Sequence, residues 1–120
     1  MEHELLTLTR RLLDAIATQD WATYEELCDP SLTCFEPEAR GQLVEGLAFH
    51  RFYFDQAARG HFQSTLCSPR VIELGPDAGV VVYTRVKQSD SGESAFEETR
   101  VWKRVAERWK HVHFHRSAIA

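Results

Sequence analysis

Four segments rich in β-branched and aromatic residues fill the second half of the chain, and they constrain its fold more than any other feature. The turn clusters GPDAG, SDSG and AER separate them, a spacing typical of hairpins. The segments are STLCSPRVIELG, AGVVVYTRVKQS, SAFEETRVWKRV and RWKHVHFHRS. We therefore expect successive antiparallel strands of one sheet.

The first half of the chain shows helical spacing instead. One apolar stripe has residues three and four positions apart, as on a buried helix face: Leu5, Leu8, Leu12 and Ile16. Asp20 can cap a second helix that includes Cys28 and stops at Asp29-Pro30. SLTCFE then predicts a short strand, and LAFHRFYFDQAA predicts a third helix. This order predicts one α+β domain over residues 1–120, with N-terminal helices packed on one face of a curved antiparallel sheet.

Charge and cysteine content exclude several classes of partner. The net charge is −4, whereas a nucleic-acid-binding domain usually carries a strong basic patch. No apolar run approaches the ~20 residues that a membrane span needs. The three cysteines are Cys28, Cys34 and Cys67, and no CxxC motif occurs, which favours free thiols in a reducing compartment. We expect a cytoplasmic protein without nucleic acid or membrane partners.

Each of the last three predicted strands carries an arginine on an otherwise apolar face. Because side chains alternate along a strand, Arg85 lies with Tyr83, Arg100 lies with Trp102, and Arg116 lies with Val112 and Phe114. Buried arginines without partners are costly, so acids or a bound anion must compensate them. A guanidinium can hold a carboxylate through two parallel hydrogen bonds, which suggests a pocket for a small carboxylate.

A structural network is the alternative interpretation of the same arginines. In that case, carboxylates of the protein itself form ion pairs with the guanidinium groups, and no external anion is needed. The candidate acids are Glu36, Glu45, Glu97 and Glu98. The residue pattern leaves both interpretations open.

The histidines of HVHFHRS alternate in the same way, which puts His111, His113 and His115 together on the opposite face. A zinc site needs three or four converging ligands and a second shell, and no Cys or Asp cluster lies nearby in the sequence. We therefore predict a structural or interface role for this row, no stoichiometric zinc, no metal ligands and no cofactor. His50 stands alone among aromatic residues and is predicted to be a hydrogen-bonded core residue.

Three stretches are similar to the association, or hub, domain of the calcium/calmodulin-dependent protein kinase II family. They are CDPSLTCFEPEARGQLVEGLAFHRFYF, EETRVWKR and WKHVHFHRS, and the resemblance extends from about Glu4 to Ser117. It implies a nuclear transport factor 2-like (cystatin-like) cone. It also implies that the chain is its own partner, as a dimer at minimum and as a closed ring of ten or more subunits.

The resemblance further implies a pocket that accepts small carboxylates. The residues of this chain at the matching motif positions of the family pocket are Arg85, Arg100, Arg116, Tyr24 and His50. The chain contains neither a kinase domain nor a basic amphipathic calmodulin-binding segment, so we expect no calmodulin binding. Ala58 stands where animal hubs have tryptophan, and the hairpin at SDSGESA is shorter than theirs.

Other functions share this cone, so the fold alone does not decide between them. The alternatives to the hub are a small-molecule-binding protein and an enzyme resembling ketosteroid isomerases or SnoaL-like polyketide cyclases. An enzyme needs a general base in the pocket, for which Tyr24 and His50 are the candidates, and arginines could stabilise an enolate. We favour the oligomerisation hub and assign no catalytic residue.

Overall fold

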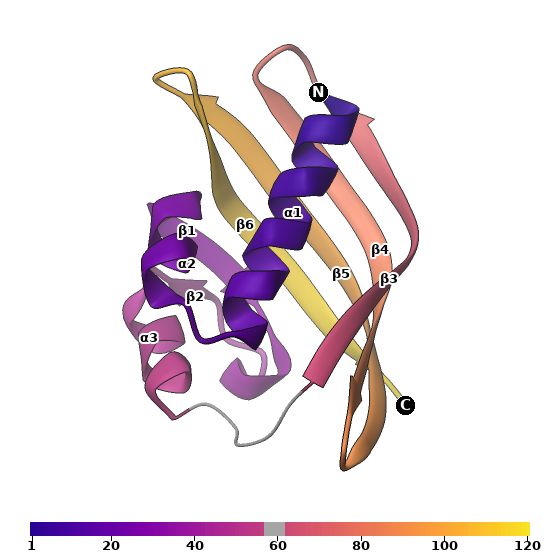
Figure 1. The fold of residues 1–120 in the computed structure, drawn as a ribbon. Coiled ribbons are helices and arrows are strands. Elements are labelled where there is room, and N and C mark those ends of the chain that lie inside the picture. The colour runs from indigo at the N-terminus through magenta and orange to yellow at the C-terminus, as the bar shows by residue number, and fades with distance from the viewer. Residues whose placement is uncertain (57–61) are drawn as a thin grey trace.

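A computed structural model describes residues 1–56 and 62–120 (Figure 1). The predicted end of the third helix and Ala58 lie outside these residues. Three helices and a short 3-10 turn are α1 (Glu2–Ala17), α2 (Trp21–Leu27), α3 (Ala48–Asp55) and η1 (Pro37–Ala39). The strands are β1 (Cys28–Phe35), β2 (Val44–Glu45), β3 (Phe62–Glu73), β4 (Ala78–Ser89), β5 (Gly92–Val105) and β6 (Arg108–Ile119).

The strands form one sheet in the order β2-β1-β6-β5-β4-β3, and the helices lie on one face of it (Figure 1). The three predicted hairpins are confirmed as antiparallel pairs. β1 and β6, however, pair in parallel, whereas the sequence predicted antiparallel pairing throughout. Parallel strands need a long connection, and the chain between β1 and β6 includes all the other strands.

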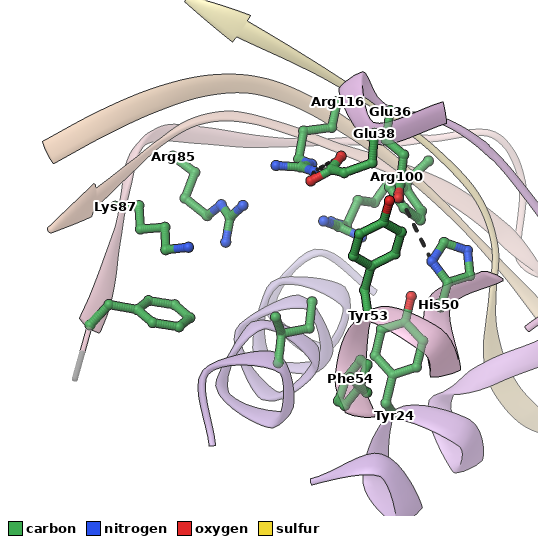
Figure 2. Close-up of a pocket in the computed structure, with 13 residues that line it drawn as sticks. Tyr24, Glu36, Glu38, His50, Tyr53, Phe54, Arg85, Lys87, Arg100 and Arg116 are labelled. Carbon is green, nitrogen blue, oxygen red and sulfur yellow. Dashed lines mark hydrogen bonds and ion pairs between the residues drawn. The ribbon is translucent and has the colours of Figure 1, made fainter. Parts of the chain in front are cut away.

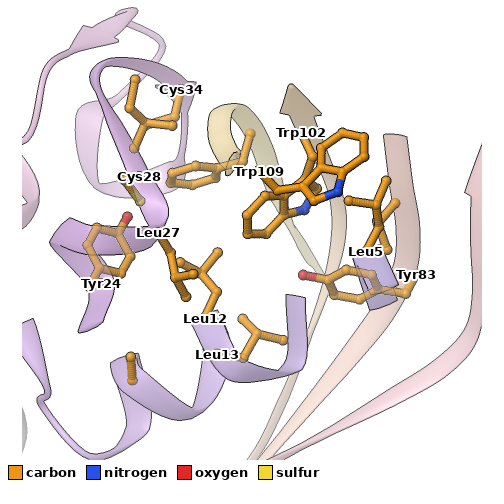
Figure 3. Close-up of a cluster of buried hydrophobic side chains, with 14 of the residues drawn as sticks. Leu5, Leu12, Leu13, Tyr24, Leu27, Cys28, Cys34, Tyr83, Trp102 and Trp109 are labelled. Carbon is orange, nitrogen blue, oxygen red and sulfur yellow. The ribbon is translucent and has the colours of Figure 1, made fainter. Parts of the chain in front are cut away.

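Helix α1 covers the centre of the sheet with its predicted apolar stripe. Leu5 and Leu12 are fully buried, and Leu8 and Ile16 are partly buried. Trp102 of β5 packs beneath the helix and donates a hydrogen bond from its indole N–H to Thr9 Oγ1 at 3.1 Å. Figure 3 shows this core, in which Trp102 and Trp109 lie near the leucines of α1.

The capping role of Asp20 is confirmed, since its Oδ1 accepts a hydrogen bond from the Thr23 backbone N–H at 3.1 Å. The helix ends at Leu27, so the prediction that Cys28 belongs to it is wrong. Strand β1 begins at Cys28 and includes Pro30. Its pairing with β6 is irregular between Cys28 and Thr33. Pro30 lies in this irregular part, so its missing N–H costs the sheet no hydrogen bond.

A bulge in β6 changes which histidines face the helices. Trp102 pairs with His111 and Val101 pairs with His113, so Val112 is the extra residue. His111 is consequently fully buried and stacks on Phe114, with ring centroids 5.5 Å apart. The prediction that His111 shares a face with His113 and His115, and Val112 with Phe114, is therefore wrong. No glycine marks the bulge, so the sequence carried no signal for it.

Over the described residues, no helix is both long enough and apolar enough to cross a bilayer.

Candidate functional site: an arginine-lined cavity

A cavity of about 190 Å³ opens between the helices and the curved face of β4, β5 and β6 (Figure 2). This volume matches roughly six water molecules, which limits any occupant to a small molecule. The lining residues are Ile16, Tyr24, Glu36, Glu38, His50, Tyr53, Phe54, Phe62, Arg85, Lys87, Arg100, Phe114 and Arg116.

All five site residues predicted from the sequence line this one cavity: Tyr24 from α2, His50 from α3, Arg85 from β4, Arg100 from β5 and Arg116 from β6. Strand alternation places the arginines on the inner face, and the helices bring the other two residues over it. Phe114, on the same face as Arg116, forms part of the apolar wall. Trp102 does not line the cavity, because it is fully buried beneath α1.

Glu98 is the acid that compensates the two deepest arginines. Its Oε1 accepts hydrogen bonds from Arg100 Nη2 at 3.0 Å and from the Tyr83 hydroxyl at 2.6 Å. Its Oε2 lies 2.8 Å from Arg85 Nε. Burial opposes ionisation of Glu98, but Arg100 and Arg85 outweigh burial and hold the pKa of this carboxyl below its ordinary value. The structural network is therefore present for Arg85 and Arg100.

Glu98 was one of four candidate partners, and the other three do not fill this role. Glu45 and Glu97 are exposed, and no carboxylate oxygen of Glu36 lies within ion-pair distance of an arginine among the described residues. Strand alternation could have favoured Glu98 over Glu97, because Glu98 precedes Arg100 by two positions and shares its face. Its contact with Arg85 depends on strand register. Strand β5 carries Glu98 directly opposite Tyr83, which completes the hydrogen-bonded group.

Arg116 lies closer to the surface and pairs with Glu38 of η1 (Figure 2). Its guanidinium also lies over the Phe96 ring, 4.7 Å from the ring centroid. Sequence reasoning missed Glu38, because only the path of the chain after β1 brings η1 beside β6.

Lys87 also lines the cavity and was not predicted. Its ammonium lies 4.2 Å from the centroid of the Phe62 ring, and no carboxylate of the described residues forms an ion pair with it. Burial, together with Arg85, lowers the pKa of Lys87. Strand alternation could have identified it, because Lys87 follows Arg85 by two positions. With Glu36, Glu38 and Glu98 as the acids, the four basic side chains leave the cavity a formal excess of one positive charge.

His50 closes the helix side of the cavity as a buried, neutral imidazole. It is only 6% exposed. Its Nδ1 lies 3.9 Å from Glu36 Oε2, and its Nε2 lies 3.6 Å from Cys34 Sγ. Burial, assisted by the Arg100 charge, lowers the pKa of His50 to about 4. Burial, with Glu38 nearby, raises the pKa of Glu36.

We expect the free energy of unfolding to fall as the pH decreases from 6.5 to about 4, because His50 stays neutral in the folded protein and gains a proton only on unfolding. The shift corresponds to about 3 kcal/mol. Urea unfolding at several pH values measures this slope. His50→Gln should reduce the slope without abolishing it, because burial also lowers the pKa of His111. The exposed His3→Gln should leave the slope unchanged. Equal slopes in all three proteins would contradict the prediction. Because the pKa of Glu36 is raised, this carboxyl makes the folded protein more stable as the pH falls. All three proteins keep Glu36, so the difference between their slopes reports the imidazole.

Comparisons with known proteins agree with this fold. The sequence model of the calcium/calmodulin dependent protein kinase II association domain matches residues 1–120. The chain is 44% identical over 121 residues to calcium/calmodulin-dependent protein kinase type II of Caenorhabditis elegans, covering 97% of this chain and 17% of the relative. It spans 24% of the Drosophila melanogaster alpha chain, with 42% identity. The chain thus covers less than a quarter of the length of these relatives.

Solved structures give the same result. The crystal structure of the S. rosetta CaMKII hub superposes with a TM-score of 0.89 at 42% identity, covering 98% of this chain and 96% of that one. A nuclear transport factor 2 (NTF2)-like protein from Cytophaga hutchinsonii has a TM-score of 0.81 at 20% identity, covering 98% and 97%. The fold is therefore the NTF2-like cone, and the chain belongs to the association-domain family of calcium/calmodulin-dependent protein kinase II.

Proposed function

We propose that the chain is an oligomerisation hub that assembles with copies of itself into a closed ring of ten or more subunits. Membership of the association-domain family is the observation that carries this proposal. The sheet face opposite the helices adds support, because its half-buried side chains include Val80, Val82, Val101 and Val112. Identical heterologous contacts between subunits either close into a ring or continue as filaments.

Light scattering of the purified protein at micromolar concentration tests the assembly. We expect a mass of at least ten chains of 13.8 kDa each. Val101→Lys should reduce the mass, because a charge on this face is costly to bury in an interface. Thr7→Lys, at an exposed position of α1, is the matched control and should leave the mass unchanged. A dimer would contradict the ring, and a monomer would contradict self-assembly altogether.

We further propose that the cavity of this hub binds a small carboxylate or sulfonate. The support is the group of four basic side chains, Arg85, Lys87, Arg100 and Arg116, in a volume too small for a large ligand. Arg85 and Arg100 share one carboxylate, and each guanidinium has more donors than that carboxylate can accept. In thermal unfolding titrations, small hydroxy- and keto-carboxylates should therefore raise the melting temperature of the protein.

A further inference from the structure

Three potential metal ligands meet at the wall of the cavity, between β1 and α3. Cys34 is fully buried, and the side chains of Glu36 and His50 are 8% and 6% exposed. Cys34 and Glu36 are two positions apart, so the extended chain directs both to the same side. The first turn of α3 then brings His50 against them. Glu36 and His50 line the cavity, and Cys34 lies behind them.

Two of the three distances within this trio fit a tetrahedral ion. Cys34 Sγ lies 3.5 Å from Glu36 Oε2 and 3.6 Å from His50 Nε2, and the ligand atoms all lie within 4.8 Å of one another. Zinc bonds of about 2.3 Å to sulfur and 2.0–2.2 Å to nitrogen or oxygen place tetrahedral neighbours about 3.3–3.6 Å apart. The two distances from Cys34 Sγ match this spacing. Glu36 Oε2 instead lies 3.9 Å from Nδ1, the other ring nitrogen of His50, so the carboxylate must rotate toward Nε2 to complete the site.

We propose that Cys34, Glu36 and His50 bind one divalent transition-metal ion of the zinc class. A thiolate, an imidazole and a carboxylate are the ligand types that zinc prefers, whereas magnesium and calcium require oxygen ligands. The fourth position is completed by water or by an anion from the cavity, because two of the three ligands line it. The site does not require ring assembly or a bound carboxylate, but it shares Glu36 and His50 with the lining of the cavity.

The charges around the trio are compatible with a bound cation. The ion, one thiolate and one carboxylate sum to zero, so the occupied site is neutral. The formal charge beside Arg100 and Arg116 rises by one unit on binding, because the empty site carries only the Glu36 carboxylate. Those arginines already pair with Glu98 and Glu38. The imidazole is neutral, as a ligand must be, because its pKa is lowered to about 4. Burial and Glu36 raise the pKa of the Cys34 thiol, so its proton must pass to solvent when the metal binds.

The sequence predicted no metal, because that prediction considered only the histidine row. Cys34 and His50 are 16 positions apart and meet only when α3 packs against β1. Cys28 and His111 also form a buried sulfur–imidazole pair at 3.5 Å, but no third ligand completes it among the described residues. Replacement of Cys28 is therefore a matched control for replacement of Cys34.

Cobalt(II) titration under reducing conditions tests the site, with the metal added both to the folded protein and during refolding. We expect a thiolate-to-cobalt charge-transfer band and the visible bands of a tetrahedral ion, saturating at one ion per chain and displaced by zinc. Cys34→Ala should abolish the charge-transfer band and weaken zinc binding at least about 100-fold. Cys28→Ala and Cys67→Ala should retain both.

The near-isosteric Glu36→Gln gives a second readout if Cys34→Ala fails to fold, as judged by circular dichroism. It should keep the thiolate band but weaken metal affinity. Absence of the band in the wild-type protein under both loading conditions would overturn the proposal. It would also be overturned if Cys34→Ala keeps the band, or if metal is lost instead on replacing His113 and His115.

Discussion

Replacing Glu98 with alanine is expected to lower the free energy of unfolding by about 3–5 kcal/mol, the range measured when one partner of a buried ion pair is removed. Glu98 is 2% exposed, and Arg85 and Arg100 are 5% and 2% exposed. Without the carboxylate, two guanidinium groups remain in the interior with uncharged partners alone. Arg100 keeps the Tyr83 hydroxyl at 2.8 Å and the His111 imidazole at 3.5 Å, and Arg85 keeps the Ser64 hydroxyl at 3.4 Å. The loss should therefore exceed that of an ordinary surface substitution several-fold.

Urea unfolding of wild type, Glu98→Ala and Glu98→Gln measures this effect at one fixed protein concentration, since assembly links stability to concentration. Glu98→Gln keeps the shape and one acceptor oxygen, so its loss should be smaller than that of alanine. The neighbouring Glu97→Ala is the control, because Glu97 is exposed on the other face of β5. A loss below about 1 kcal/mol for Glu98→Ala would mean that water or another acid satisfies the arginines.

The periodicity of the sequence was sufficient to predict the helices, the three hairpins and the inward direction of the arginines. Each of these depends on a local rule: three-and-four spacing in a helix or alternation in a strand. Arg85, Arg100 and Arg116 therefore reached the same cavity as predicted. Lys87 obeys the same rule and could have been included.

What the sequence left undetermined depends on contacts between distant segments. The bulge at Val112, which turns His111 inward, arises from the register of β5 and β6 and has no residue-type signal. The pairing of Arg116 with Glu38 requires η1 to lie beside β6. The contact of Glu98 with Arg85 and Tyr83 required the register of β4 and β5, although alternation alone places Glu98 beside Arg100. Local rules fix the direction of a side chain, whereas its partner is fixed by tertiary structure.

Arg116→Ala is expected to remove most of the thermal stabilisation that small carboxylates give to the wild-type protein. A ligand at 100 times its dissociation constant adds about 2.7 kcal/mol, because only the folded state binds it. For a domain of this size, that corresponds to a rise of roughly 10 °C. Loss of a charge-assisted contact of about 1.5–3 kcal/mol weakens binding about 10- to 100-fold. The rise at the same ligand concentration should then fall to about half or less.

Arg104→Ala is the matched control for this variant. Arg104 also lies over an aromatic ring, 4.7 Å from the Trp109 centroid, and it also has an acidic partner, Asp77. It does not line the cavity. Its replacement should therefore leave the carboxylate response unchanged. If no carboxylate stabilises the wild type, or if Arg116→Ala responds as strongly as the wild type, the arginines are purely structural.

Glu38→Gln should have the opposite effect from Arg116→Ala. Glu38 occupies the guanidinium of Arg116 in the structure, so a carboxylate ligand must compete with it. A partly exposed pair of this kind contributes up to about 1 kcal/mol, and its removal should tighten carboxylate binding by up to about fivefold.

Neutral amides of the same acids should stabilise neither the wild-type protein nor Glu38→Gln. A guanidinium offers only donors and needs two acceptors opposite it, whereas an amide presents a single carbonyl oxygen beside its own N–H donors. Equal responses to an acid and its amide would show that shape, not charge, governs the cavity.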